Sequence, residues 1–183
     1  MKNFFITMVL FLMNSTTVYL QEVAPKHQIS INASKFIVLF NEQVSNLDLT
    51  YRYTLEDKNL NLRLATSIDL GTSETDISDY SVRIGADKLF KESDRWKFYV
   101  GMDANYSRTI AKSTGRLTNK TGLIPFIGIL HHFGPHFSLS TEPSFAIFRN
   151  EIIDQDSFNP NASSIDYTFN FINLGQIKVG FHF

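Results

Sequence analysis

A histidine and a serine two positions apart, His136 and Ser138, have the types and spacing that could do chemistry. In a His-x-Ser pair on a strand, the imidazole can act as the base that activates the hydroxyl nucleophile. Glu142 could orient the imidazole of His136. The pair directly follows a predicted tight turn, so a turn histidine and an inward-facing serine are the simpler interpretation.

Four histidines gather near the same predicted end of the molecule: His131, His132, His136 and His182. Imidazoles close together can bind a metal ion. His131 and His132 are neighbours on a strand and point to opposite faces, so at most one of them could join His182. We expect histidines of turns and interfaces rather than a metal site, and we expect no cofactor. The sequence has Cys 0, which excludes thiolate ligands and disulfides.

The elements that must position these residues are strands, because apolar and polar side chains alternate along most of the chain. The clearest example is Leu47 to Leu55, where Leu and Tyr alternate with Asp, Thr and Arg. Eight strands are predicted, at residues 28–40, 47–55, 60–70, 80–90, 96–106, 122–133, 137–149 and 170–183, with the phase of the last running back to Ile165. Between them, tight turns (56–59, 91–95 and 134–136) alternate with longer loops (41–46, 71–79, 110–121 and 150–164). This order predicts an antiparallel up-and-down barrel with tight turns at one end and longer loops at the other.

The polar faces of these strands carry charges of both signs in similar number. Opposite charges can satisfy one another inside a narrow barrel, where an unpaired charge would be costly. We therefore predict a lattice of charges in the lumen, made of Asp48, Arg52, Arg63, Asp69, Arg83, Asp87, Lys97, Asp103, Glu142 and Lys178.

Aromatic residues lie near the ends of the apolar stripes. Tyr80 and Phe90 bracket one strand, and Trp96 and Tyr106 bracket the next. At about 3.3 Å per residue and a tilt near 40–45°, each pair would span roughly 25 Å along a membrane normal. This spacing predicts an aromatic girdle on an outer face turned toward lipid. A secreted soluble barrel that holds an apolar ligand is the alternative that alternation alone leaves open.

Length and composition bound the remaining possibilities. A chain of 183 residues suggests one domain, and its net charge of -1 argues against a nucleic-acid partner. No apolar run reaches the roughly 18–20 residues that a transmembrane helix needs. Lys2 followed by the short apolar stretch Phe4 to Met13 is typical of a secretory signal peptide. We expect a signal peptide at residues 1–20 and a barrel domain at residues 21–183.

With these features the chain resembles the small OmpA/OmpX-type outer-membrane barrels, and most of all the outer-membrane-protein β-barrel domains of Bacteroidetes. The resemblance covers the signal, the eight strands and the terminal aromatic residue. It implies a bacterial outer-membrane location, contact with lipid and lipopolysaccharide, and a monomer. In such families the last strand is recognised by the barrel-assembly machinery, assisted by periplasmic chaperones. Gln176, Phe181 and Phe183 match that assembly signal, whereas Lys178 stands where the family has glycine.

The expected function is a structural or surface-interaction role, since an eight-stranded barrel holds little more than its own side chains and would not form an open pore. A lipid-modifying enzyme is the alternative. Outer-membrane lipid A deacylases and phospholipases resemble this chain in the His136 and Ser138 pair. Those deacylases act from the loop end, whereas this pair is predicted at the turn end, so we expect no enzymatic activity. A basic loop around Lys112, Arg116 and Lys120 could contact lipopolysaccharide phosphates.

Overall fold

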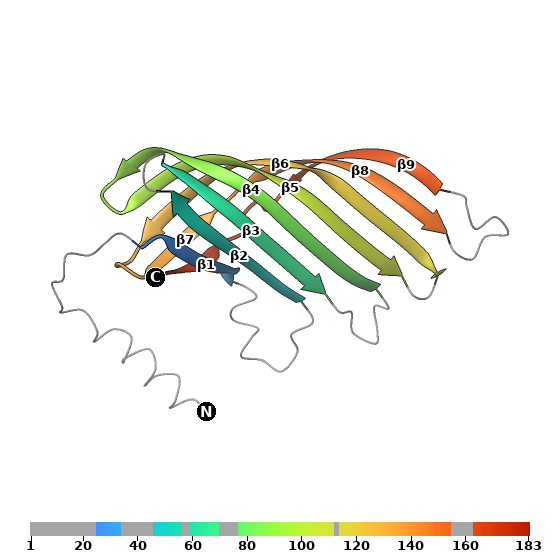
Figure 1. The fold of residues 1–183 in the computed structure, drawn as a ribbon, viewed down its shortest axis with the longest axis horizontal. Helices are drawn as coiled ribbons and strands as arrows, with labels where there is room; N and C mark the ends of the chain where they lie inside the picture. Colours follow the sequence, from blue (N-terminus) through green and yellow to red (C-terminus); the bar gives the residue numbers. More distant parts are fainter. Residues whose placement is uncertain (1–24, 34–45, 56–58, 70–76, 112–113, 155–162) are drawn as a thin grey trace, which may run out of the picture.

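The computed structural model describes residues 25–33, 46–55, 59–69, 77–111, 114–154 and 163–183 (Figure 1). Within these ranges the fold is all β. The strands are β1 (His27–Asn32), β2 (Asn46–Leu55), β3 (Leu60–Asp69), β4 (Ile77–Ser93), β5 (Trp96–Ala111), β6 (Arg116–His132), β7 (Phe137–Thr141), β8 (Ser144–Asp154), β9 (Ser163–Ile172) and β10 (Lys178–His182). No helix in the described part of the chain is long and apolar enough to cross a bilayer.

The strands close into an antiparallel barrel that corresponds to the eight predicted strands. The sheet runs β5-β4-β3-β2-β1-β10-β7-β6-β8-β9, and a further pairing of β5 with β6 completes the ring. The predicted seventh strand is split into β7 and β8, and the predicted eighth is split into β9 and β10. The predicted fold class, a closed eight-stranded up-and-down barrel, is therefore confirmed.

The first and last described segments meet at one end of the barrel, as expected. β1 pairs with β10, with Gln28 opposite His182. The backbones of His27 and Phe183 exchange hydrogen bonds of 3.1 and 3.0 Å. Figure 1 accordingly places the C-terminus beside β1. We call this end, which carries the β4–β5 and β6–β7 turns, the turn end, and the opposite end the loop end.

Several strands extend beyond their predicted bounds. β5 and β6 stay paired as far as Ala111 and Arg116, so the predicted loop 110–121 was wrong and only residues 112–115 separate the two strands. The polar residues between Arg116 and Lys120 resemble a loop in sequence, but a ladder can continue past an apolar band because its hydrogen bonds use the backbone alone. Consequently Arg116 and Lys120 lie on β6, and Lys112 falls outside the described residues.

The predicted turn 91–95 is likewise shorter, because β4 and β5 pair as far as Ser93 and Trp96. Asp94 adopts a positive φ of 48°, a conformation that short polar side chains tolerate in turns. A bulge between Leu89 and Lys91 adds one residue to β4 at this end. The remainder of the predicted strand 28–40 beyond β1 lies outside the described residues, apart from Ala33.

The last two predicted strands are interrupted at the same level of the wall. Between β7 and β8 lie Glu142 and Pro143, and proline has no N–H to donate to a ladder. Between β9 and β10 the chain turns at Asn173 and Gly175, whose φ angles are 58° and 74°. The N–H of Gln176 donates to the carbonyl of Asn173 at 3.3 Å, which closes this turn. The prediction of one continuous last strand was wrong here, although residues of odd number face outward on both sides of the break.

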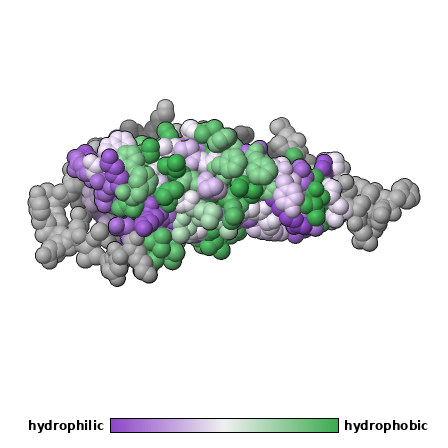
Figure 2. All heavy atoms as spheres, turned by 90° about the horizontal axis from the view of Figure 1, so that it is seen from above, coloured by the Kyte–Doolittle hydropathy of each residue, from purple (hydrophilic) through white to green (hydrophobic). Residues whose placement is uncertain are grey.

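The two faces of the wall differ sharply in polarity. Large apolar side chains point outward, such as Ile84 at 63% and Phe169 at 62% exposure, whereas Asp87 at 1% and Asp103 at 2% are enclosed. Figure 2 shows the apolar residues as a band around the middle of the visible face, with polar residues toward both ends. The predicted girdle residues all lie exposed on the outer surface: Tyr80, Phe90, Trp96 and Tyr106.

Candidate functional site

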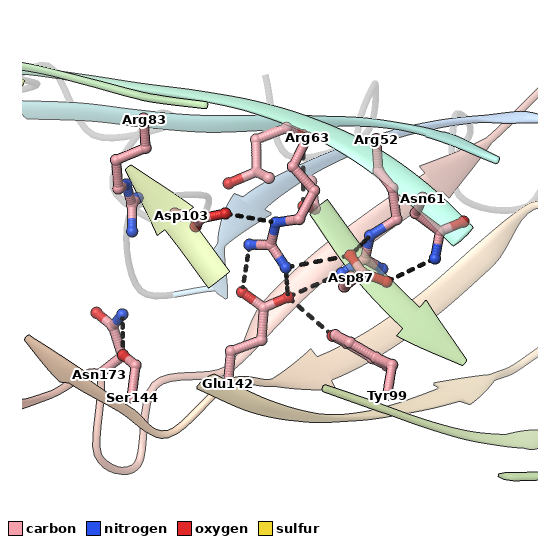
Figure 3. A network of polar contacts seen from close by, with 12 residues as sticks. Arg52, Asn61, Arg63, Arg83, Asp87, Tyr99, Asp103, Glu142, Ser144 and Asn173 are labelled. Atoms are coloured by element: carbon pink, nitrogen blue, oxygen red, sulfur yellow. Dashed lines mark hydrogen bonds and ion pairs between the residues drawn. The ribbon is translucent and has the colours of Figure 1, made fainter. Parts of the chain in front are cut away.

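The lumen is organised around one carboxylate, that of Glu142, which lies at the break between β7 and β8 (Figure 3). Arg63 donates to both of its oxygens at 2.9 Å, and Arg52 donates to Oε1 at 2.9 Å. The Tyr99 hydroxyl also donates to Oε1 at 2.8 Å, and the Lys178 ammonium donates to Oε2 at 2.6 Å. Four side chains from four strands thus converge on one buried anion, and charge-assisted bonds of this kind are the strong ones.

Two further carboxylates complete the network. Asp87 lies 2.9 Å from Arg52 Nε and accepts a hydrogen bond of 2.6 Å from Asn61. Asp103 lies 3.4 Å from Arg63 Nε. The network therefore joins three cations to three anions, and all six charged residues are buried. Because the charges match in number, the network carries no net charge, which limits the cost of enclosing it.

Aromatic rings support the two guanidinium groups. Arg52 lies 4.4 Å from the centroid of the Tyr99 ring, and Arg63 lies 4.1 Å from that of Phe126. Such contacts add cation–π attraction to the ion pairs. A Cβ on Gly128 would overlap the Tyr99 ring, and one on Gly101 would overlap Phe126. The two glycines therefore make room for the rings, and charged and aromatic side chains together fill the lumen at this level.

Six of the ten predicted lattice residues belong to this network: Arg52, Arg63, Asp87, Asp103, Glu142 and Lys178. The other four lie elsewhere. Asp48 and Arg83 form a separate pair at 3.4 Å, nearer the loop end. Lys97 pairs at 3.1 Å with the half-exposed Glu92 at the turn end. Asp69 ends β3, six residues beyond Arg63.

Sequence reasoning missed Tyr99 and Asn61 as members of the network. Tyr99 had a usable signal, since it shares the polar phase of β5 with Lys97 and Asp103. Its hydroxyl needs a partner when buried, and Glu142 supplies it. Asn61 had the corresponding phase on β3, two residues from Arg63.

The histidine that contacts Ser138 is His182 and not His136. His182 Nε2 and Ser138 Oγ form a hydrogen bond of 2.7 Å, whereas the Nδ1 of the exposed His136 donates to the carbonyl of His182 at 3.0 Å. Cross-strand register explains this, because Ser138 lies opposite Gly180 and has His182 as its diagonal neighbour. The contact of His136 with Ser138 that the enzyme alternative requires is therefore not formed, and the predicted inward direction of Ser138 is confirmed.

The remaining histidines at the turn end point in different directions. His131 packs against the Trp96 ring at 4.3 Å, on the outer surface. His132 faces His182, with ring centroids 4.7 Å apart. Only one of the two neighbours thus joins His182, as predicted. Within the described ranges, no group of three or more His, Asp or Glu side chains has an arrangement that could hold a metal ion.

On the turn-end side of the network the lumen widens into a cavity of about 550 Å³. We call it the turn-end cavity. Arg52 and Tyr99 line its inner part, and Arg95 and Lys97 lie toward its mouth. On the other side of the network lies a narrow crevice, which Asp103 and Glu142 line together with Arg83, Ile124, Phe126, Ser144 and Asn173.

Comparisons with known proteins give distant likenesses among solved structures. No protein-family model and no curated protein matches the sequence. The structure of Neisserial surface protein A is similar over 86% of this chain and 93% of that one, at 12% identity and a TM-score of 0.43. A major outer membrane protein from Thermus thermophilus is similar over 86% and 99% of the two chains, at 12% identity and a TM-score of 0.39.

Proposed function

We propose that this chain is an integral β-barrel protein of a bacterial outer membrane, with a closed lumen and a structural or surface-interaction role. The observation that carries the proposal is the polarity of the wall, apolar outside and charged inside. In water, a barrel with Ile84, Phe169 and Phe171 more than half exposed would be prone to aggregate, whereas in lipid those side chains are solvated. The turn end would then face the periplasm, as short turns do in such barrels.

Heat-modifiability tests the membrane barrel. Outer-membrane fractions are run on a gel with and without boiling, and a folded barrel is expected to migrate differently from the boiled chain. Recovery of native protein in a detergent-free soluble fraction would contradict the proposal and favour a soluble barrel that holds an apolar ligand.

The closed lumen rests on the network around Glu142. Arg52, Arg63 and Tyr99 meet at this carboxylate from three strands, and an ion would have to displace these contacts to pass. We expect planar-bilayer recordings of the purified protein to show no large, steady conductance. Steady large channels would refute this part of the proposal.

We further propose that the chain is not a lipid hydrolase acting through His136 and Ser138. The support is geometric, because Ser138 is 1% exposed and is hydrogen-bonded to His182. We expect outer membranes to have the same lipid A acylation with the parent chain and with Ser138→Ala. Deacylation that is lost in Ser138→Ala would overturn this statement.

For biogenesis we propose that residues 1–20 are removed as a signal peptide and that the barrel-assembly machinery recognises Gln176, Phe181 and Phe183. Phe181 and Phe183 are exposed on the outer surface of the last strand, where a partner could reach them. N-terminal sequencing of the purified protein tests the cleavage. Phe183→Ala is expected to reduce the amount of assembled barrel. Unchanged assembly would show that Phe183 is not part of the signal that the machinery recognises.

A further inference from the structure

The turn-end cavity is large enough for a small molecule and has no role in the function proposed above. Its volume of about 550 Å³ lies within the roughly 300–1,000 Å³ usual for ligand pockets. Described residues of several strands and of the β4–β5 and β6–β7 turns line it, so its walls belong to the barrel itself.

The network at the inner end of the cavity is electrically asymmetric. Arg52 lines the cavity, whereas its partners Asp87 and Glu142 do not. The carboxylates of Asp103 and Glu142 line the crevice on the opposite side. Although the network has no net charge, it therefore presents the guanidinium group of Arg52 toward the turn end and the carboxylates of Asp103 and Glu142 toward the loop end, while Asp87 lines neither space.

The side walls add hydrogen-bond donors that carry no negative charge. His132 and His182 lie side by side there, and Gln28 and Asn61 also line the cavity. The Asn61 amide already donates one N–H to Asp87, and Gln28 accepts from Arg52 through its Oε1. The second N–H of Asn61, the amide N–H groups of Gln28 and the imidazoles are the groups that can donate to an oxygen anion. Glu92 and Asp94 are the only carboxylates among the described lining residues, and both lie exposed on the β4–β5 turn.

Two cationic side chains, those of Arg95 and Lys97, lie at the mouth of the cavity. Lys97 pairs with Glu92, but this pair is 39% and 50% exposed, so water screens it and a ligand can compete for the lysine. Arg95 lies exposed in the turn and lines the same mouth. A small anion that enters the cavity would thus pass Arg95 and Lys97 and approach Arg52.

We propose that the turn-end cavity binds a small anion bearing carboxylate or phosphate oxygens. If the barrel has the orientation proposed above, the ligand comes from the periplasm. The binding itself does not depend on that orientation, because it is a property of the folded barrel in any membrane or micelle.

The histidines provide a test with internal controls. The barrel is refolded in detergent micelles with ¹³C-labelled histidine, and the imidazole signals are followed by NMR during titration with citrate at fixed pH and ionic strength. We expect the signals of His132 and His182 to shift with saturation. The signal of His131, which packs against Trp96 on the outer surface, should stay in place.

Arg95→Gln and Lys97→Gln are each expected to weaken citrate binding about two- to fivefold, as the loss of an exposed charge contact does. Lys91→Gln is the matched control, because Lys91 is exposed at the same end but does not line the cavity. Each variant is first shown to fold by its heat-modifiable mobility.

The outcomes separate the possible ligands. Tighter binding of citrate assigns a carboxylate ligand, and tighter binding of inorganic phosphate in a parallel titration assigns a phosphate ligand. Equal shifts with glucose, shifts that do not saturate, or binding unchanged in both Gln variants would overturn the anion site. A barrel that fails to refold in micelles but is found in the soluble fraction would instead refute the proposed membrane location.

Discussion

The barrel wall has a continuous side and an interrupted side. From β3 to β6 the ladders are long, and β5 pairs with β6 without a break from Trp96 to Ala111. On the other side β7 and β10 have five residues each, and Pro143 lies at the level of the turn at Asn173 and Gly175. Figure 1 shows the long strands of the continuous side as a tilted, regular wall.

The difference lies in what each side contributes to the lumen. The continuous side supplies Arg63, Asp87, Tyr99 and Asp103 at regular alternating positions. The interrupted side supplies Glu142, the anion on which the network converges, from a residue that belongs to no strand. The break in the wall thus lies next to Glu142, the residue of the network that accepts hydrogen bonds from four side chains.

The largest expected effect is that of Glu142→Ala on the interrupted side. This variant leaves Arg52, Arg63 and Lys178 facing only two carboxylates in a buried site. Removing one partner of a buried ion pair costs about 3–5 kcal/mol. We expect a loss of this order in the free energy of unfolding, measured by urea titration in detergent.

Glu92→Ala is the matched control, because the pair of Glu92 with Lys97 is exposed and contributes below about 1 kcal/mol. Similar losses for the two variants would mean that the network does not stabilise the barrel.

On the continuous side, Gly128→Ala is expected to destabilise the barrel by about 1–3 kcal/mol, the usual cost of overpacking. The added Cβ would overlap the Tyr99 ring and displace the hydroxyl that donates to Glu142. Gly134→Ala is the control, since no atom lies within 4 Å of a Cβ there. Thermal unfolding in micelles measures the stability of both variants. An unchanged unfolding midpoint for Gly128→Ala would show that the Tyr99 ring can move aside without a loss of stability.

Amide hydrogen exchange compares the two sides directly. Leu174 and Gly175 lie in the turn between β9 and β10, whereas Val82 and Ile84 lie within paired strands. Locally irregular segments open more easily than paired ones, so we expect exchange at least about tenfold faster in the turn. Equal protection, measured by NMR in micelles, would mean that the break does not weaken the wall.

Alternation of side chains predicted which residues of the continuous side face outward, although not the full lengths of β4, β5 and β6. β2 and β3 lie within a residue of their predicted bounds, because one face of each is uniformly apolar and the other polar. The outward direction of Tyr80 and Trp96 followed from the same alternation. Because successive side chains of a strand point to opposite faces, the sequence position determines which face a residue occupies. In a barrel, that face determines whether the side chain points into the lumen or outward.

The interrupted side could not be predicted in this way. Lys178 and Phe181 keep the same alternation that Phe169 has before the break, so the phase across residues 173–177 gives no sign of the turn. The partner of Ser138 depended on cross-strand register, which the sequence does not specify. Which of the ten lattice charges meet at Glu142 likewise depends on the stagger between strands, so only their common direction could be predicted.

Fluorescence of Trp96 tests the central claim, that the apolar face of this barrel is turned toward lipid. Trp96 is the only tryptophan of the chain, and it lies 46% exposed on the outer face near the turn end. The barrel is reconstituted into bilayers whose lipids carry bromine, a contact quencher, either near the headgroup or near the middle of the bilayer. We predict strong quenching by the shallow bromine and weaker quenching by the deep bromine, because Trp96 belongs to the interfacial girdle. Quenching by aqueous iodide, with no effect of either brominated lipid, would contradict the membrane barrel.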